Sequence, residues 1–212
     1  MSEGKQFLGE ARGVIHVGAN TGQERDLYAG HGLPVVWIEP IPEVFERLRR
    51  NIEGYPGQRA YQALIADEDG RSYTFHIADN DGESSSIFDL GDHRDVWPEV
   101  SYARRITVEG ITLASFLERH AVDVAAFDTL VLDTQGSELL VLKGAEPILP
   151  GIAQVWTEAA DFEAYRGGAR LDEIGDFLSG RGFREAGRRV FADRPQGGAY
   201  YDVLYRRDRP PG

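Results

Sequence analysis

Short apolar runs alternate with amphipathic stretches along the first third of the chain. Residues 13–17, 35–39 and 60–65 are apolar runs of strand length. Residues 21–29 and 43–51 lie between them and have helical spacing of apolar positions. The apolar runs do not alternate with polar residues, as is typical of strands that are buried on both faces. The order strand–helix–strand–helix–strand predicts a parallel sheet with helices on both sides.

The middle of the chain interrupts this pattern. Ser72–Ala78 alternates and predicts a strand, residues 106–108 are strand-like, and a helix is expected from Thr112 to about His120. Residues 79–101 show no periodicity and hold several glycines, serines and acids. Stretches of this length without structure are uncommon in compact domains unless they have a function, so we expect a loop or lid.

The second half returns to alternation and then changes. Two further strands, two helices and a closing antiparallel strand pair are expected, at residues 129–133, 137–144, 152–158, 171–180, 183–191 and 200–205 in chain order. The prediction is one α/β domain over residues 1–212, with a doubly wound, Rossmann-like, mostly parallel sheet. The C-terminal strand pair is antiparallel, and the loop or lid at about 79–101 is an insertion.

Composition narrows the class of protein. Among 212 residues, 23 are Lys or Arg and 35 are Asp or Glu, for a net charge of -12, which disfavours non-specific binding to nucleic acid. The chain has no cysteine, which excludes disulfides and thiolate sites and fits a reducing cytoplasm. It has no apolar run of about 18 residues and no signal-peptide core at its start. We therefore expect a cytoplasmic protein with no membrane partner.

A glycine-rich turn follows the first predicted strand. It reads Val17-Gly18-Ala19-Asn20-Thr21-Gly22, and its glycines allow a ligand to approach the backbone closely. The dinucleotide fingerprint requires glycine where Asn20 stands, and no phosphate loop follows Gly18. The turn therefore favours a ligand without phosphates, such as an adenosyl amino acid, whose zwitterionic end Asn20 and Thr21 can bind. A tight turn without a ligand is the alternative.

Glu39 ends the second predicted strand, 21 residues after Gly18. An acid about 20 residues beyond such a turn accepts hydrogen bonds from ribose hydroxyls in nucleotide-binding α/β sheets. A carboxylate offers two acceptor oxygens to a vicinal diol. The alternative is an acid that merely precedes Pro40 at a helix entry.

Two more carboxylates, Asp133 and Glu138, flank the turn after the strand at residues 129–133. This strand is expected beside the first one, so Asp133 should face the same crevice as Gly18. The pair could bind an ammonium group, orient a hydroxyl or act as a base. The alternative is a capped turn in which the helix N-terminus stabilises Glu138.

Residues 14–24 (VIHVGANTGQE), 37–40 (WIEP) and 132–145 (LDTQGSELLVLKGA) together resemble the FkbM family of methyltransferases. Residues 82–87 (GESSSI) and 156–158 (WTE) also fit the pattern of that family. The third segment is the most specific, and the resemblance covers most of the chain.

The resemblance implies a seven-stranded methyltransferase sheet, S-adenosylmethionine as the methyl donor, and O-methylation of a small molecule or sugar. Many members carry Asp where His16 stands and Glu where Gln135 stands. The residues expected to bind the cofactor are His16, Gly18, Ala19, Asn20, Thr21, Gly22, Glu24, Glu39, Pro40, Ala63, Leu64, Asp133 and Gln135. The residues expected to bind the acceptor are Ser84, Ser85 and Ser86.

An alcohol acceptor must lose a proton, which requires a base within hydrogen-bond reach. The expected catalytic residues are Asp133, Glu138 and Glu158, and His16 and His93 are further candidates for the base. The acids of residues 79–101 match no defined metal loop, so no metal is expected.

Two other functions remain open at this stage. A nicotinamide-dependent oxidoreductase is disfavoured by the missing second glycine of the turn. A non-catalytic domain that binds an adenosyl ligand or a protein partner would carry the same carboxylates, because a fold does not by itself determine a function.

Overall fold

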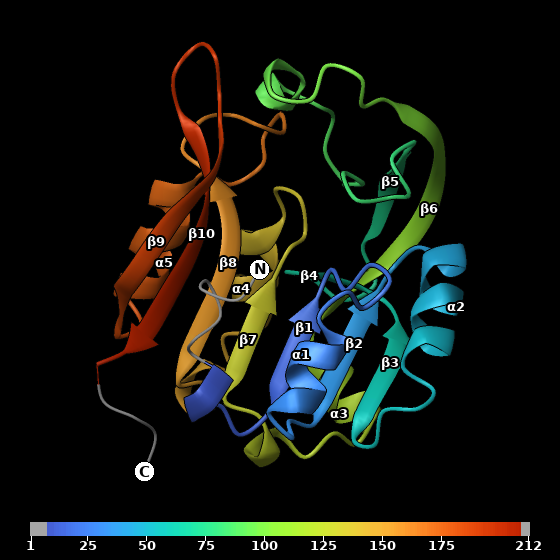
Figure 1. The fold of residues 1–212 in the computed structure, drawn as a ribbon, viewed down its shortest axis with the longest axis vertical. Coiled ribbons are helices and arrows are strands. Elements are labelled where there is room, and N and C mark those ends of the chain that lie inside the picture. Colours follow the sequence, from blue (N-terminus) through green and yellow to red (C-terminus); the bar gives the residue numbers. More distant parts are fainter. Residues whose placement is uncertain (1–7, 209–212) are drawn as a thin grey trace.

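The computed structural model describes residues 8–208. Its main sheet has seven strands in the order β3-β2-β1-β7-β8-β10-β9 (Figure 1). Their bounds are β1 (Val14–Val17), β2 (Val35–Glu39), β3 (Gln58–Gln62), β7 (Thr129–Leu132), β8 (Gln154–Ala160), β9 (Phe183–Asp193) and β10 (Ala199–Arg207). Strand β10 runs antiparallel to both of its neighbours, β8 and β9, and the other six strands run in one direction. The predicted doubly wound, mostly parallel sheet with an antiparallel C-terminal pair is confirmed.

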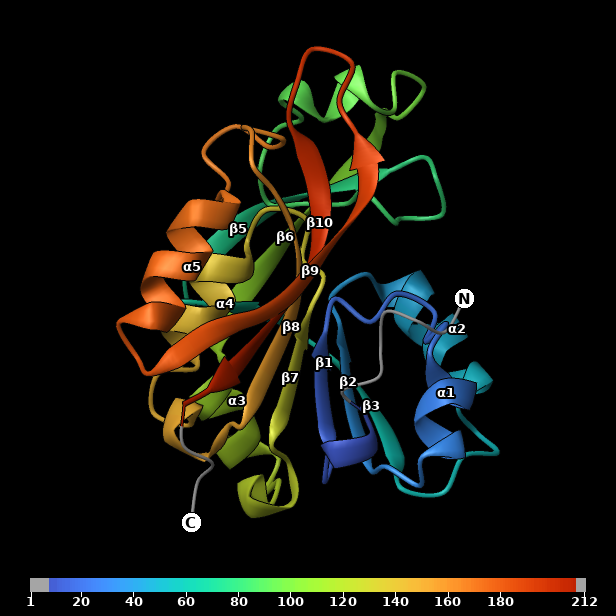
Figure 2. The same cartoon turned by 60° about the vertical axis from the view of Figure 1, so that its left-hand side comes forward.

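Helices cover both faces of this sheet, as Figure 2 shows. They are α1 (Arg25–Gly30), α2 (Pro42–Asn51), α3 (Leu113–Arg119), α4 (Glu138–Gly144) and α5 (Leu171–Ser179). In β1, Val14 packs in the cluster that contains Tyr28 of α1, whereas Ile15 packs in the cluster that contains Val141 of α4. Both faces of β1 are therefore buried, which explains why its sequence does not alternate. None of the helices in residues 8–208 is long and apolar enough to cross a membrane.

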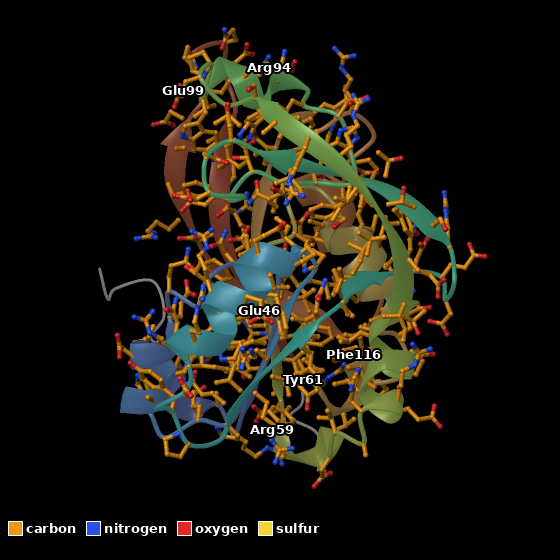
Figure 3. All side chains as sticks on the ribbon, turned by 90° about the vertical axis from the view of Figure 1, so that its right-hand side faces the viewer. Glu46, Arg59, Tyr61, Arg94, Glu99 and Phe116 are labelled. Atoms are coloured by element: carbon orange, nitrogen blue, oxygen red, sulfur yellow. The ribbon has the colours of Figure 1, made fainter. Side chains whose placement is uncertain are left out.

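Residues 60–65 do not form one strand, so that prediction is wrong. The chain leaves the main sheet after Gln62, and β4 (Leu64–Ala66) joins a second sheet with β5 (Ser72–Ala78) and β6 (Tyr102–Thr112). The three residues of β4 are buried. Ile65 pairs with Ile111 of β6, and β4 also contacts α4. In Figure 3, Tyr61 of β3 and Phe116 of α3 lie together, with ring centroids 5.5 Å apart.

Helix α1 begins at Arg25, four residues later than predicted. The intervening residues form turns, in which the backbone N–H of Gly22 donates to the carbonyl oxygen of Ala19. Asn20 has a positive φ of 43°. Such turns leave the first residues after β1 at the carboxyl edge of the sheet, where ligands bind in open α/β folds.

The segment of residues 79–101 has little regular secondary structure, but hydrogen bonds and ion pairs hold it to the rest of the domain. It contains a short 3-10 helix, η2 (Asp92–Asp95), and the backbone N–H groups of Gly91 and His93 both donate to the carbonyl oxygen of Ala164. Arg194, in the turn between β9 and β10, forms ion pairs with Asp92 and Asp95 at 2.9 and 2.7 Å. Figure 1 shows this segment and the β9–β10 hairpin tip at the same end of the molecule.

Candidate active site

A cavity of about 710 Å³ lies at the carboxyl ends of β1, β2, β7 and β8. Its opposite wall comes from residues 79–101 and from Phe191 of β9. The cavity is lined by these predicted site residues: His16, Gly18, Ala19, Asn20, Glu24, Glu39, Pro40, Ala63, Leu64, Ser84, Ser85, Asp133, Gln135 and Glu158. Four other predicted residues, Thr21, Gly22, Ser86 and Glu138, are not among its lining residues.

Gly18 is required by the packing of two strand ends. Its φ is +82°, and a Cβ built on it would lie 1.8 Å from the carbonyl oxygen of Asp133. The backbone N–H of Asp133 in turn donates to the carbonyl oxygen of Val17. A side chain at position 18 would therefore push β1 and β7 apart at the floor of the cavity.

The carboxylate of Glu39 is buried and held by two backbone donors. The N–H of Asn20 donates to Oε2 at 2.9 Å, and the N–H of Ile41 donates to Oε1 at 2.8 Å. Burial nevertheless raises the pKa of Glu39 to about 8, because desolvation outweighs the two hydrogen bonds. Each oxygen retains a lone pair that a hydroxyl in the cavity can use.

His16 is buried on β1 within an aromatic group. Its Nδ1 lies 3.2 Å from the hydroxyl oxygen of Tyr28, and its ring stacks on Trp37 with centroids 5.0 Å apart. The imidazole also lines the cavity beside the glycine turn. Packing against these two rings thus fixes the imidazole at the cavity wall.

Asp133 follows the last residue of β7, Glu158 lies on the adjacent parallel strand β8 just beyond the residue paired with Leu132, and both line the cavity. Gln135 connects this pair to the rest of the site, because its Nε2 donates to Oδ1 of Asp133 at 2.6 Å and its Oε1 accepts from the hydroxyl of Tyr165 at 2.5 Å. Desolvation raises the pKa of Glu158 well above its ordinary value, and the charges of Asp133 and Asp202 raise it further. A carboxylate whose pKa is raised in this way is a stronger base than a solvated one.

The carboxylate of Glu138 accepts hydrogen bonds from the backbone of the turn that precedes α4. Its Oε1 accepts from the backbone N–H of Thr134 at 2.8 Å, and its Oε2 accepts from the backbone N–H of Gly136 at 3.0 Å. The side chain is buried beneath the turn and does not reach the main cavity. This geometry matches the capped turn that the sequence left open as the alternative.

The three serines of residues 84–86 divide between the cavity and the backbone. Ser84 and Ser85 line the cavity, although their hydroxyls also contact Asn80 and the N–H of Ala78. The hydroxyl of Ser86 donates to the carbonyl oxygen of Gln135 at 2.7 Å and accepts from the N–H of Phe88. Ser86 therefore holds the segment against the turn after β7.

Several cavity residues have no signal in the sequence. Phe191 is 38% exposed, and nothing in the sequence of its strand marks it as a site residue. The β9–β10 hairpin nevertheless brings it to the cavity wall. Asn80, Glu83 and Glu99 also line the cavity from residues 79–101. Figure 3 shows Glu99 with Arg94 at the end of the molecule that this segment forms. No local pattern predicts contacts that depend on how distant segments meet.

Comparison with known proteins identifies related sequences. The model of the methyltransferase FkbM domain matches residues 16–185. A curated relative, the 2-O-methyltransferase NoeI of Sinorhizobium fredii, is 27% identical over 173 residues, which cover 78% of this chain and 70% of that protein.

Solved structures share the fold. A protein of the NADB-Rossmann superfamily from Streptococcus agalactiae superposes with a TM-score of 0.53 at 10% identity, covering 98% of this chain and 68% of its own. A putative tRNA methyltransferase of Streptococcus pneumoniae, solved with S-adenosyl-L-methionine, gives 0.52 at 10% identity, covering 95% and 71%. At these identities the likeness concerns the fold alone.

Proposed function

Because this chain belongs to the FkbM family of methyltransferases, it is an S-adenosylmethionine-dependent O-methyltransferase, and we propose that its acceptor is a small hydroxylated molecule without phosphate groups. The observation that supports this proposal is a single cavity lined both by residues of the glycine turn and by Glu158. NoeI, whose name describes methylation of an oxygen at position 2, supports a hydroxyl acceptor.

The residues around the glycine turn fit S-adenosylmethionine. Close approach of the backbone at Gly18 and the buried carboxylate of Glu39 suit a ribose diol, which needs two acceptor oxygens. All five of the following residues line the cavity, and we propose that His16, Glu24 and Asp133 hold the amino-acid end while Ala63 and Leu64 form an apolar wall for the adenine. When bound, this group supplies a methyl carbon on positively charged sulfur, which an oxygen nucleophile can attack directly.

Glu158 is the proposed general base. It removes the proton of the acceptor hydroxyl as the new oxygen–carbon bond forms and the sulfur–carbon bond breaks. Asp133 raises the pKa of Glu158, and Gln135 orients Asp133 through a 2.6 Å hydrogen bond. Because the methyl donor is already activated, correct placement of acceptor and base supplies much of the remaining rate.

The charge of the cavity supports an acceptor without phosphates. Seven acidic residues line it, and none of the lysines and arginines within residues 8–208 does; the acids are Glu24, Glu39, Asp79, Glu83, Glu99, Asp133 and Glu158. Burial raises the pKa of Glu39 and of Glu158, which reduces their share of the negative charge. The remaining charge repels an anionic acceptor and attracts the positively charged methyl donor. The same argument disfavours a nucleic-acid acceptor. We also propose that residues 1–212 act as one methyltransferase domain in which the 79–101 segment forms the acceptor wall.

Calorimetric titration with S-adenosylmethionine and S-adenosylhomocysteine tests the cofactor site. We expect binding near the micromolar range, about −8 kcal/mol, and its loss in Glu39→Ala. Val190→Ala, at an exposed position that does not line the cavity, is the control and should bind as the parent does. Incubation with neutral and phosphorylated sugars, followed by mass spectrometry, then tests the acceptor. Methylation of phosphorylated sugars in preference to neutral ones would contradict the proposed acceptor class.

A further inference from the structure

The imidazole of His93 is a buried polar group at the cavity that the proposed reaction does not use. His93 lies in η2, is only 2% exposed and lines the cavity. Its Nδ1 lies 2.6 Å from the hydroxyl oxygen of Tyr200. Its Nε2 is buried and has no hydrogen-bond partner within residues 8–208.

Three aromatic rings hold this imidazole in one orientation. The ring centroids of Trp97, Tyr165 and Tyr200 lie 4.7, 5.1 and 5.9 Å from that of His93. Because the ring cannot turn freely, Nε2 cannot find another partner by rotating. A buried polar atom without a partner costs free energy, and such atoms in folded proteins call for a specific explanation.

The ionisation of His93 restricts what can bind to it. Burial lowers the pKa of His93 to about 4, so the imidazole is neutral near pH 7. A neutral imidazole has one N–H and one lone pair, and contact with Tyr200 occupies Nδ1. Nε2 therefore suits a hydroxyl group, which can either accept or donate, and it gives no charge attraction to an anion.

The surroundings of His93 suit a ring more than a chain. Trp97 and Phe191 also line the cavity, and their rings are stacked with centroids 6.3 Å apart. Phe191 keeps 38% of its surface exposed at this wall. Aromatic faces at a cavity wall pack well against the apolar face of a sugar or cyclitol ring.

The position of His93 separates it from the proposed base. Tyr200 pairs with Ala160 of β8, two residues beyond Glu158 on the same strand. The charge of Glu158 also contributes to the raised pKa of Tyr200, after desolvation, so the two side chains lie near each other. Glu158 and His93 both line the cavity, so one molecule bound in it can lie against both side chains.

We propose that Nε2 of His93 binds a second hydroxyl of the acceptor, one that is not methylated, and so selects a polyhydroxylated ring. The proposal rests on the proposed O-methyltransferase function and adds a specificity-determining residue to it. Tyr200 is the positioning residue that fixes the imidazole.

Imidazole NMR signals of the protein loaded with S-adenosylhomocysteine test this directly. Methyl glucoside is the polyhydroxylated probe, cyclohexanol is the single-hydroxyl probe, and glucose 6-phosphate is the anionic probe. The signals of His93 are assigned by their loss in His93→Gln. We expect a saturable shift of the His93 signals with methyl glucoside and a shift at least about fivefold weaker in affinity with the other two.

Two variants separate a binding role from a structural one. Tyr200→Phe keeps the ring of His93 but frees its Nδ1, and we expect methyl glucoside to bind at least about fivefold more weakly. Binding of S-adenosylhomocysteine should stay within about twofold in this variant. Tyr205→Phe, on the same strand but outside this cavity, is the matched control and should leave both affinities unchanged.

Either of two results would overturn the proposal. One is the absence of any His93 shift with methyl glucoside in protein that binds S-adenosylhomocysteine. The other is equal binding of methyl glucoside by parent and Tyr200→Phe. Failure to bind S-adenosylhomocysteine at all would instead count against the proposed function, so the two failures are distinguishable.

Discussion

The backbone N–H of Asn20 donates a hydrogen bond to Oε2 of Glu39 at 2.9 Å. This bond joins the turn after β1 to the last residue of β2, the two places that the sequence marks as a nucleotide-type site. The carboxylate of Glu39 therefore holds the turn after β1 in place even without a ligand. Its burial and its pKa of about 8 make it sensitive to pH.

Glu39→Gln is expected to remove part of the pH dependence of stability. The unfolded chain ionises Glu39 near 4.5, whereas the folded chain retains the proton to about 8. The free energy of unfolding of the parent should therefore fall as pH rises between these values, by at most about 1.4 kcal/mol per pKa unit. Urea unfolding at several pH values measures this fall. Parallel curves for parent and variant would show that Glu39 does not titrate in this way.

Gly18→Ala should destabilise the protein by about 3 kcal/mol or more. The added methyl group would lie 1.8 Å from a backbone oxygen, and the φ of +82° is unfavourable for alanine. Gly187→Ala is the matched control, because a Cβ there meets nothing within 4 Å. Denaturant unfolding of both variants gives the difference. Similar stabilities would mean that the strand ends can separate without cost.

Glu158→Gln should lower kcat by roughly 10²–10⁴-fold, because the amide cannot accept the hydroxyl proton. The affinity for S-adenosylmethionine should change little. In the parent, kcat should fall as pH decreases through the raised pKa of Glu158, because the protonated carboxyl is no longer a base.

Asp202→Asn provides the control for this assignment. Asp202 lies opposite Glu158 on β10, and its charge helps to raise the pKa of Glu158. The variant should keep most of its activity but move the acidic limb of the pH profile to lower pH. An unmoved limb would assign the limb to another group.

Glu138→Ala should reduce stability without changing the chemistry. The substitution leaves the partly buried N–H groups of Thr134 and Gly136 without these acceptors, at a cost of up to about 1–3 kcal/mol each. The kcat of the folded variant should stay within about tenfold of that of the parent. Thermal unfolding and activity measured below the transition test both parts, and a loss of activity as large as that of Glu158→Gln would make Glu138 a member of the catalytic group.

Local patterns predicted most of the main sheet, because its strands carry unbroken apolar runs between clear turns. The helix expected from Thr112 is α3, whose first residue is Leu113, and the hydroxyl of Thr112 accepts from the N–H of Ser115. The break between β3 and β4 was missed because no glycine, proline or other turn residue marks it. Only packing against α4 determines that the chain changes sheets at this point.

The candidate site divides in the same way. Gly18, Glu39 and Asp133 follow strand ends, and the sequence placed them at one edge because parallel strands end together. The capping position of Glu138 and the hydrogen bonds of Ser86 depend on turn geometry that periodicity does not encode. Phe191 lines the cavity because the β9–β10 hairpin extends to its wall, and no local pattern encodes this contact.

The ion pairs of Arg194 with Asp92 and Asp95 have an evolutionary consequence. They tie the hairpin turn to the 79–101 segment at a distance from the strand ends that form the glycine turn. If residues 79–101 form the acceptor wall, as proposed, substitutions, insertions or deletions in the hairpin would reshape that wall while the turn after β1 keeps its geometry. A change of acceptor would then require changes in this one pair of loops and none in the sheet.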